Sequence, residues 1–99
     1  MIQGTTPTHY FTLPFEANLV DEARVIYRQG TKEILRKETA DFSREGNRIS
    51  VTLTQEETFR FDYKVAVKFQ LRVRTTTGKV LNTKPMLASV DECLDTEVL

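Results

Sequence analysis

The residues of this chain that could perform chemistry are one cysteine, one histidine and a few carboxylates. Cys93 and His9 would have to act together as a nucleophile and its base, but nothing in the sequence brings them close. A reactive thiolate also needs an electropositive setting, whereas the acidic residues between Asp91 and Asp95 surround Cys93. We therefore expect an inert or partly exposed thiol rather than a catalytic one.

Other kinds of active site also lack necessary parts. One cysteine and one histidine leave half of a tetrahedral zinc site to carboxylates, and no recognisable ligand spacing is present. The carboxylates near turns have no neighbouring base, nucleophile or glycine-rich phosphate loop. These carboxylates are Asp41, Asp62, Glu56 and Glu57. The three serines cannot form a triad with one remote histidine. We expect a protein that is not an enzyme and that uses no metal or cofactor.

A row of basic side chains offers a binding chemistry instead. Four of them share the solvent parity of one strand, and two more extend the row across the next hairpin. The predicted interaction surface consists of Lys64, Lys68, Arg72, Arg74, Lys79 and Lys84. Such a row can bind phosphates, but nucleic-acid binding also uses stacking aromatics, and Phe69 has the opposite parity. Cross-strand pairs with Glu33, Glu38 or the acidic C-terminal residues explain the row equally well.

The strand that positions this row has the clearest pattern in the sequence. From Val65 to Arg74 every odd position is apolar, and all but one even position is polar or charged. This period of two predicts a β-strand with one buried and one solvated face. The segment from Val80 to Val90 should return beside it, with Val80, Met86, Ala88 and Val90 on one parity. Pro85 removes a ladder donor, which predicts an edge or a bulge there.

Shorter segments repeat the β pattern. Strands are expected from Thr8 to Leu13 at a sheet edge, from Leu19 to Tyr27 with an early bulge at Asp21, around Ile34-Leu35 as a charged edge, and from Ile49 to Leu53. The spacing of Thr54 and Glu57 is that of a capping box and predicts one helical turn near 55–60 that crosses between sheets. We predict an all-β fold, an antiparallel immunoglobulin-like β-sandwich of about seven strands, with a small α+β roll as the rival; Tyr63 could form a tyrosine corner.

Length and charge indicate one domain with an acidic end. Residues 1–99 suffice for a single core, and no apolar run could span a bilayer. The N-terminus lacks the features of a secretory signal, so we expect cytoplasmic synthesis. All 14 basic residues but only 10 of the 14 acidic ones precede residue 91, so the tail of residues 91–99 has a net charge of −4. This tail is interpreted as a frayed solubilising end or as a peptide that docks on another subunit.

Three blocks of the sequence resemble a group of short prophage-encoded proteins of Gram-positive gut bacteria. They are the opening from Met1 to Phe15, the block from Gly46 to Thr58, and the ending from Cys93 to Leu99. The similarity extends over nearly the whole chain. The β-sandwich pattern of this group is similar to the N-terminal domain of siphophage upper-baseplate proteins.

The resemblance implies a non-enzymatic phage structural or assembly protein, associated with the tail or baseplate, with no catalytic residue to transfer. Its expected partners are other phage structural proteins or further copies of itself, and it could travel in the virion. The alternative is a small cytoplasmic protein that binds nucleic acid or a host factor through the basic row. We further expect residues 1–7 to contribute to self-association and to be dispensable for folding.

Overall fold

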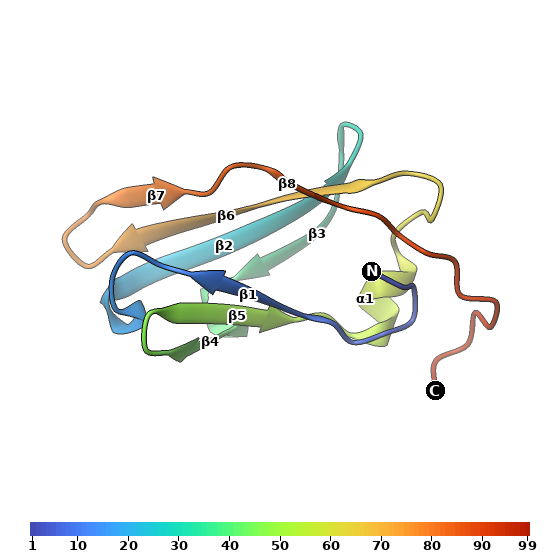
Figure 1. Cartoon of the computed structure of the whole chain (residues 1–99), viewed down its shortest axis with the longest axis horizontal. Helices are drawn as coiled ribbons and strands as arrows, with labels where there is room; N and C mark the ends of the chain where they lie inside the picture. The colour runs from blue at the N-terminus through green and yellow to red at the C-terminus, as the bar shows by residue number, and fades with distance from the viewer.

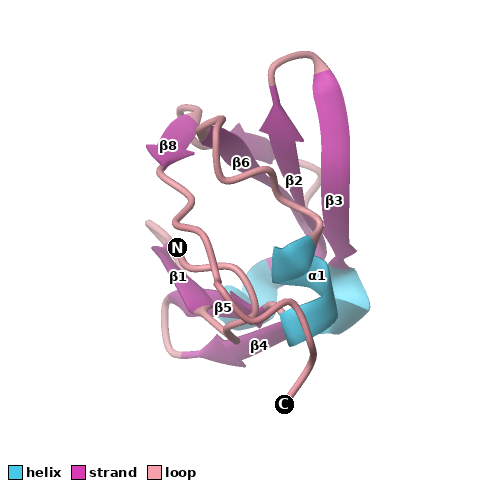
Figure 2. Cartoon of the chain, turned by 90° about the vertical axis from the view of Figure 1, so that its right-hand side faces the viewer, coloured by secondary structure: helices cyan, strands magenta, loops and turns pink.

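The computed structural model describes residues 1–99 and contains two antiparallel β-sheets packed face to face (Figures 1 and 2). The smaller sheet has the order β1 (Thr8–Thr12), β5 (Arg48–Thr52), β4 (Phe42–Glu45). The larger sheet has the order β3 (Lys32–Glu38), β2 (Val20–Gln29), β6 (Val67–Thr75), and β6 also pairs with β7 (Val80–Asn82) and β8 (Met86–Ala88). The predicted all-β sandwich is confirmed. In this sandwich the second and third strands, β2 and β3, pair with each other in one sheet. In an immunoglobulin constant domain the second and third strands lie in different sheets.

Three short helical segments connect the strands. They are η1 (Ala17–Leu19), η2 (Thr39–Asp41) and α1 (Gln55–Phe59). The predicted capping box is present, since the Thr54 hydroxyl accepts from the Glu57 amide at 3.1 Å and the Glu57 carboxylate accepts from the Thr54 amide at 2.8 Å. As expected, α1 carries the chain from the smaller sheet to the larger one. None of these helical segments has the length and apolar character needed to cross a bilayer.

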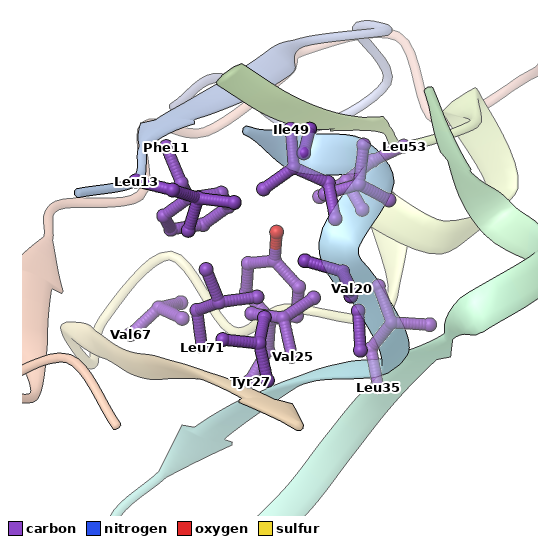
Figure 3. Packing of buried hydrophobic residues seen from close by; sticks show 14 of the residues in the cluster. Phe11, Leu13, Val20, Val25, Tyr27, Leu35, Ile49, Leu53, Val67 and Leu71 are labelled. Atoms are coloured by element: carbon purple, nitrogen blue, oxygen red, sulfur yellow. The ribbon is translucent and has the colours of Figure 1, made fainter. Parts of the chain in front are cut away.

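The core fills the space between the two sheets and contains 16 buried hydrophobic residues. The apolar parity of β5 supplies Ile49 and Val51, followed by Leu53, and β6 supplies Val67, Leu71 and Val73. Figure 3 shows Tyr27 in the middle of this cluster, with its hydroxyl oxygen directed toward the smaller sheet. Alternation therefore identified the buried face of both strands correctly.

Two residues assigned to the buried parity are exposed instead. Val65 is 41% exposed because β6 begins only at Val67. The preceding residues form a turn in which Gln29 of β2 binds the carbonyls of Asp62 and Val65 and the amide of Asp62. Val80 is 57% exposed because it lies opposite Arg74, on the outer face of the larger sheet. Val65 was misassigned because contacts from the distant Gln29 override the local pattern, and Val80 because the register of the β6–β7 hairpin places it opposite an outward-facing residue.

The predicted irregularities and edges are where the sequence placed them. The β2–β6 register shifts between Val20 and Glu22, which is the expected bulge at Asp21. The charged strand β3 is one edge of the larger sheet, and β1 is an edge of the smaller sheet. The last strand is divided at Pro85 into β7 and β8, and this division accounts for one strand more than expected.

Both chain ends lie at the end of the sandwich that carries α1 (Figure 1). The Met1 carbonyl accepts from the Asp91 amide at 2.8 Å, and the Gln3 side chain binds the Phe61 carbonyl and the Cys93 amide. The end of the acidic tail contacts α1, because the Gln55 side chain forms hydrogen bonds to the backbone of Leu99. Residues 1–7 are thus tied to the fold, so the expectation that they are dispensable for folding is wrong, and their removal should cost stability.

Tyr63 does not have the contacts of a tyrosine corner. Its side chain is 43% exposed, and it lies in the turn before β6. A hydrogen bond to Glu92 and the negative charge of that carboxylate raise the pKa of the Tyr63 hydroxyl above its usual value. The Tyr63 hydroxyl thus lies near the C-terminal segment and makes no hydrogen bond to the backbone upstream.

Candidate interaction surfaces

The predicted basic row lies on the larger sheet, and all of its six side chains are exposed. Lys68, Arg72 and Arg74 project from the outer face of β6. The other three lie in connections: Lys64 in the turn before β6, Lys79 just before β7, and Lys84 between β7 and β8. The structure therefore keeps the strand residues together on one face and distributes the lysines of the connections around its rim.

The strand β2 adds two arginines that sequence reasoning missed. In the β2–β6 register, Arg24 lies opposite Arg72, and Arg28 lies opposite Lys68. We call these four residues the basic band. Arg24 and Arg28 share the polar parity of their strand, but only the register between two strands distant in sequence shows that they face the row on β6.

Within the basic band only Arg24 forms salt bridges, with Glu22 at 3.6 Å and with Glu38 at 3.4 Å. Glu33 pairs with Arg36, and Glu38 pairs with Arg36 and Arg24, so neither glutamate reaches β6. The acidic tail forms no ion pair with the row. Lys68 and Arg28 have no salt bridge, and Arg72 donates only to the Asn82 side chain, at 2.9 Å. Like charges directly opposite each other destabilise a sheet, so stability does not explain this arrangement.

Arg74 is the exception within the row, because it pairs with acids. Its guanidinium lies 2.9 Å from Asp21 and 3.1 Å from Glu22. A hollow of about 240 Å³ lies next to it between β2, β6 and β7, and both Arg24 and Arg72 line it. The buried Nε of Arg24 has no hydrogen-bond partner, although Glu38 lies 3.4 Å away. The lining of this hollow carries more positive than negative charge, because Arg24, Arg72 and Arg74 face only one acidic residue, Glu22.

The free edge of β1 is a second candidate surface. Pro7 and Leu13 form hydrogen-bonded pairs with Leu53 and Asn47 of the neighbouring chain segment. Because hydrogen-bonded and non-hydrogen-bonded pairs alternate in an antiparallel ladder, every second residue between them turns its backbone groups away from β5. These residues are Thr8, Tyr10 and Thr12, and no second strand lies beside β1 to pair with their backbone groups. We call this row of groups the β1 edge.

The side chains next to the β1 edge are almost uncharged. The outer face of the smaller sheet carries hydroxyl groups on all three strands, from Thr8, Tyr10, Thr12, Ser43, Ser50 and Thr52. Its only charged side chains are Glu45 and Arg48, and the Arg48 guanidinium lies 4.6 Å from the centre of the Tyr10 ring. Tyr10 is 60% exposed. A neutral face rich in tyrosine, serine and threonine differs sharply from the charged face of the larger sheet and suits contact with another protein.

The inner face of β1 contains an aromatic cluster around the only histidine. The His9 ring stacks on Phe69 with centroids 5.4 Å apart, and its Nδ1 lies 2.6 Å from the hydroxyl of the buried Tyr27. Burial, with a smaller contribution from the N-terminal charge, lowers the pKa of His9. His9 is thus half-buried and packs against the aromatic side chains at the margin of the core. The sequence contained a signal for this position, because His9 and the apolar Phe11 are two residues apart and therefore share the inner face of β1.

The carboxylates considered for catalysis cap local structure. Glu57 caps α1 and lies 2.8 Å from Lys37, and although partial burial acts to raise the Glu57 pKa, the hydrogen bonds from Lys37 and Thr54 keep it below its usual value. Asp41 accepts from the Glu38 amide, and Asp62 accepts from the Lys64 amide. No group of three or more metal-ligating side chains occurs. The Cys93 thiol is half-buried and donates to the Asp95 carbonyl.

No protein-family model matches this sequence, and no curated protein is significantly similar to it.

Proposed function

We propose that this protein is a non-enzymatic structural or assembly module of a phage particle, associated with the tail or baseplate. It associates with another chain of the particle, a different structural protein or a further copy of itself, through the β1 edge. One observation carries the docking through β1: the alternate residues Thr8, Tyr10 and Thr12 turn their backbone donors and acceptors away from β5, and no other strand pairs with β1. An extended segment of another protein can add to such an edge as a further strand.

The other sheet edges are protected, which makes β1 the favoured docking strand. β3 carries five charged side chains in seven residues, and such charges discourage pairing with another chain. The edge strand β4 has only four residues, and two of them, Arg44 and Glu45, carry charges that discourage pairing. Arg44 also donates hydrogen bonds to the carbonyls of Ala17 and Val20. β7 and β8 have only three residues each and are separated by Pro85. β1 alone combines five continuous residues with the absence of lysine, arginine, acidic residues and proline.

The phage role is tested on particles from an induced culture of the source strain. Mass spectrometry of density-purified particles should detect this chain at stoichiometric levels. A prophage carrying Tyr10→Lys, which places a charge at the β1 edge, should yield particles that lack it, whereas Tyr63→Lys at another exposed tyrosine should not. Absence of the wild-type chain from particles, with abundant protein in the lysate, would refute the structural role. Normal incorporation of Tyr10→Lys would refute docking through β1.

The basic band supports a second candidate, a protein that binds nucleic acid. Two like-charged cross-strand pairs cost stability, and three of their four positive charges, on Arg28, Lys68 and Arg72, have no salt bridge. Phosphates that approach this face would relieve the repulsion and release counterions. The exposed aromatic side chains needed for base stacking are not on this face, so any binding should depend on charge and be insensitive to sequence.

A labelled single-stranded oligonucleotide tests this candidate. Binding should weaken steeply as salt rises, and Lys68→Glu should weaken it further. Lys84→Glu, which changes the same charge outside the basic band, serves as the matched control and should have a smaller effect. No binding at low salt, or equal effects of the two substitutions, would remove this candidate.

A further inference from the structure

We infer that the β1 edge pairs with β1 of a second copy of this chain, antiparallel about a two-fold axis at Tyr10. The two three-stranded sheets would then join into one continuous sheet of six strands. This inference deepens the proposed function by naming a second copy of the chain as the partner that binds the β1 edge. It rests on the proposed function only in that both assign docking to this edge. The pairing is carried by the backbone geometry, the sequence of β1 and the charge around it.

The backbone groups of β1 are matched for such a pairing. Thr8, Tyr10 and Thr12 each turn one N–H and one C=O away from β5. When Tyr10 faces Tyr10 of the second copy, Thr8 of each copy faces Thr12 of the other. Each facing pair then exchanges two hydrogen bonds, and all three donors and all three acceptors of each edge are satisfied.

The side chains of β1 are also self-complementary. The strand reads Thr-His-Tyr-Phe-Thr, which is nearly symmetric about its centre. On the outer face the two-fold pairing puts threonine opposite threonine and tyrosine opposite tyrosine, both favourable cross-strand pairs. On the inner face it puts His9 opposite Phe11, so two aromatic rings continue the cluster that already contains Phe69. No charged side chain of β1 opposes the contact.

The register is fixed by the residues that flank β1. A shift of two residues in one direction would place Thr8 opposite Pro14, which has no N–H to donate. The opposite shift would place Thr12 opposite Thr6, which lies before the strand. Only the register centred on Tyr10 uses all three outward-facing residues of both copies.

The surroundings of the β1 edge favour a second copy over a strongly charged partner. The chain has a formal net charge of zero at pH 7, so two copies do not repel each other as whole molecules. The segment after β8 runs toward α1 and the chain ends, away from the middle of β1 (Figure 1). The two copies can therefore approach along this side of the sandwich, where β1 and β8 are the outermost strands (Figure 2).

Light scattering after size-exclusion chromatography provides the first test. The 11.4-kDa chain should show a mass that rises toward twice this value as concentration increases. Tyr10→Lys, which places two like charges opposite each other, should shift the midpoint of dimerisation at least tenfold to higher concentration. Tyr63→Lys is the matched control and should behave as wild type. A monomeric mass at every concentration, or a dimer that Tyr10→Lys does not weaken, would overturn the inference.

Disulfide trapping tests the register. Facing hydrogen-bonded residues have Cα atoms about 5.5 Å apart, a separation that a disulfide can bridge. In a Cys93→Ser background, Tyr10→Cys should form a covalent dimer rapidly under mild oxidation. Ser43→Cys, exposed on the opposite edge strand β4, should not. Equal cross-linking of both variants would indicate random collision and contradict the two-fold pairing.

These tests separate the inference from the proposed function. A monomer that is still found at stoichiometric levels in purified particles would refute self-pairing and leave the phage role intact. A dimer with the predicted register that is absent from particles would support self-pairing and refute the phage role.

Discussion

The hydroxyl of Tyr27 and Nδ1 of His9 lie 2.6 Å apart and share a hydrogen bond between the two sheets, in which we assign the hydroxyl as the donor. The direction follows from burial, because the Tyr27 hydroxyl has no other partner and its proton would otherwise be buried without an acceptor. In this assignment Nδ1 of His9 is the acceptor, and the ring proton is on Nε2. This bond links β1 of the smaller sheet to β2 of the larger sheet and holds the docking strand against the core.

Acid should weaken this link. The folded pKa of His9 lies below its ordinary value of 6.5, so the unfolded chain binds more protons in the interval between the two values. The free energy of unfolding should therefore be highest above pH 6.5, decline as the pH falls below 6.5, and stop declining below the folded pKa. Urea titrations at pH 7.0 and 5.5 measure this change. The double variant His9→Phe/Tyr27→Phe removes the only histidine and both polar partners, and an equal decline in that variant would contradict the assignment.

The two valines at the start of the long apolar pattern should differ in their tolerance of charge. Val67→Asp should unfold the domain, because an unpaired buried carboxylate costs several kcal/mol, comparable to the roughly 5 to 15 kcal/mol of a typical domain. Leu71→Asp should act in the same way. Val65→Asp is the matched control on the same parity, and it should remain folded because Val65 is exposed. Circular dichroism during thermal unfolding distinguishes these outcomes, and a cooperative transition for Val67→Asp would show that the assigned face is wrong.

The side chain of Gln29 should stabilise the fold far more than that of Gln55. Its buried side chain satisfies three backbone groups of the turn before β6, so Gln29→Ala leaves these groups without partners and should cost about 2 kcal/mol or more. Gln55→Ala removes two bonds to the exposed Leu99 and should cost less than about 0.5 kcal/mol. Chemical denaturation of both variants tests the difference. Similar losses would mean that Gln29 does not hold the turn.

Charge reversal on the larger sheet should have opposite effects at two positions of β6. Lys68→Glu replaces a repulsive pair with an attractive one opposite Arg28 and should stabilise the domain by a few tenths to about 1 kcal/mol. Arg74→Glu places a carboxylate beside Asp21 and Glu22 and should lower the melting temperature. Thermal unfolding at low salt measures both shifts. A loss of stability in Lys68→Glu would show that the basic band carries no repulsion.

The sequence predicted the elements of this fold better than it predicted their neighbours. Alternation located the buried residues of β5 and β6, and the spacing of Thr54 and Glu57 located α1, because these signals are local. The alternating pattern assigned Val65 to the buried face, but Val65 lies in an exposed turn. Gln29, more than thirty residues earlier in the chain, holds this turn. The same pattern located the basic residues of β6 but not the arginines opposite them, because register between distant strands leaves no local trace.

Amide hydrogen exchange along β1 tests the central claim of an unpaired docking edge most directly. In dilute isotope-labelled protein, the amides of His9 and Phe11 should exchange slowly, because they bond to β5, and those of Thr8, Tyr10 and Thr12 should exchange rapidly. At concentrations where the protein associates, these last three amides should become protected while the amides of β3 do not change. Protection of all five amides in the dilute monomer, or no protection of the three edge amides in the associated state, would contradict the account.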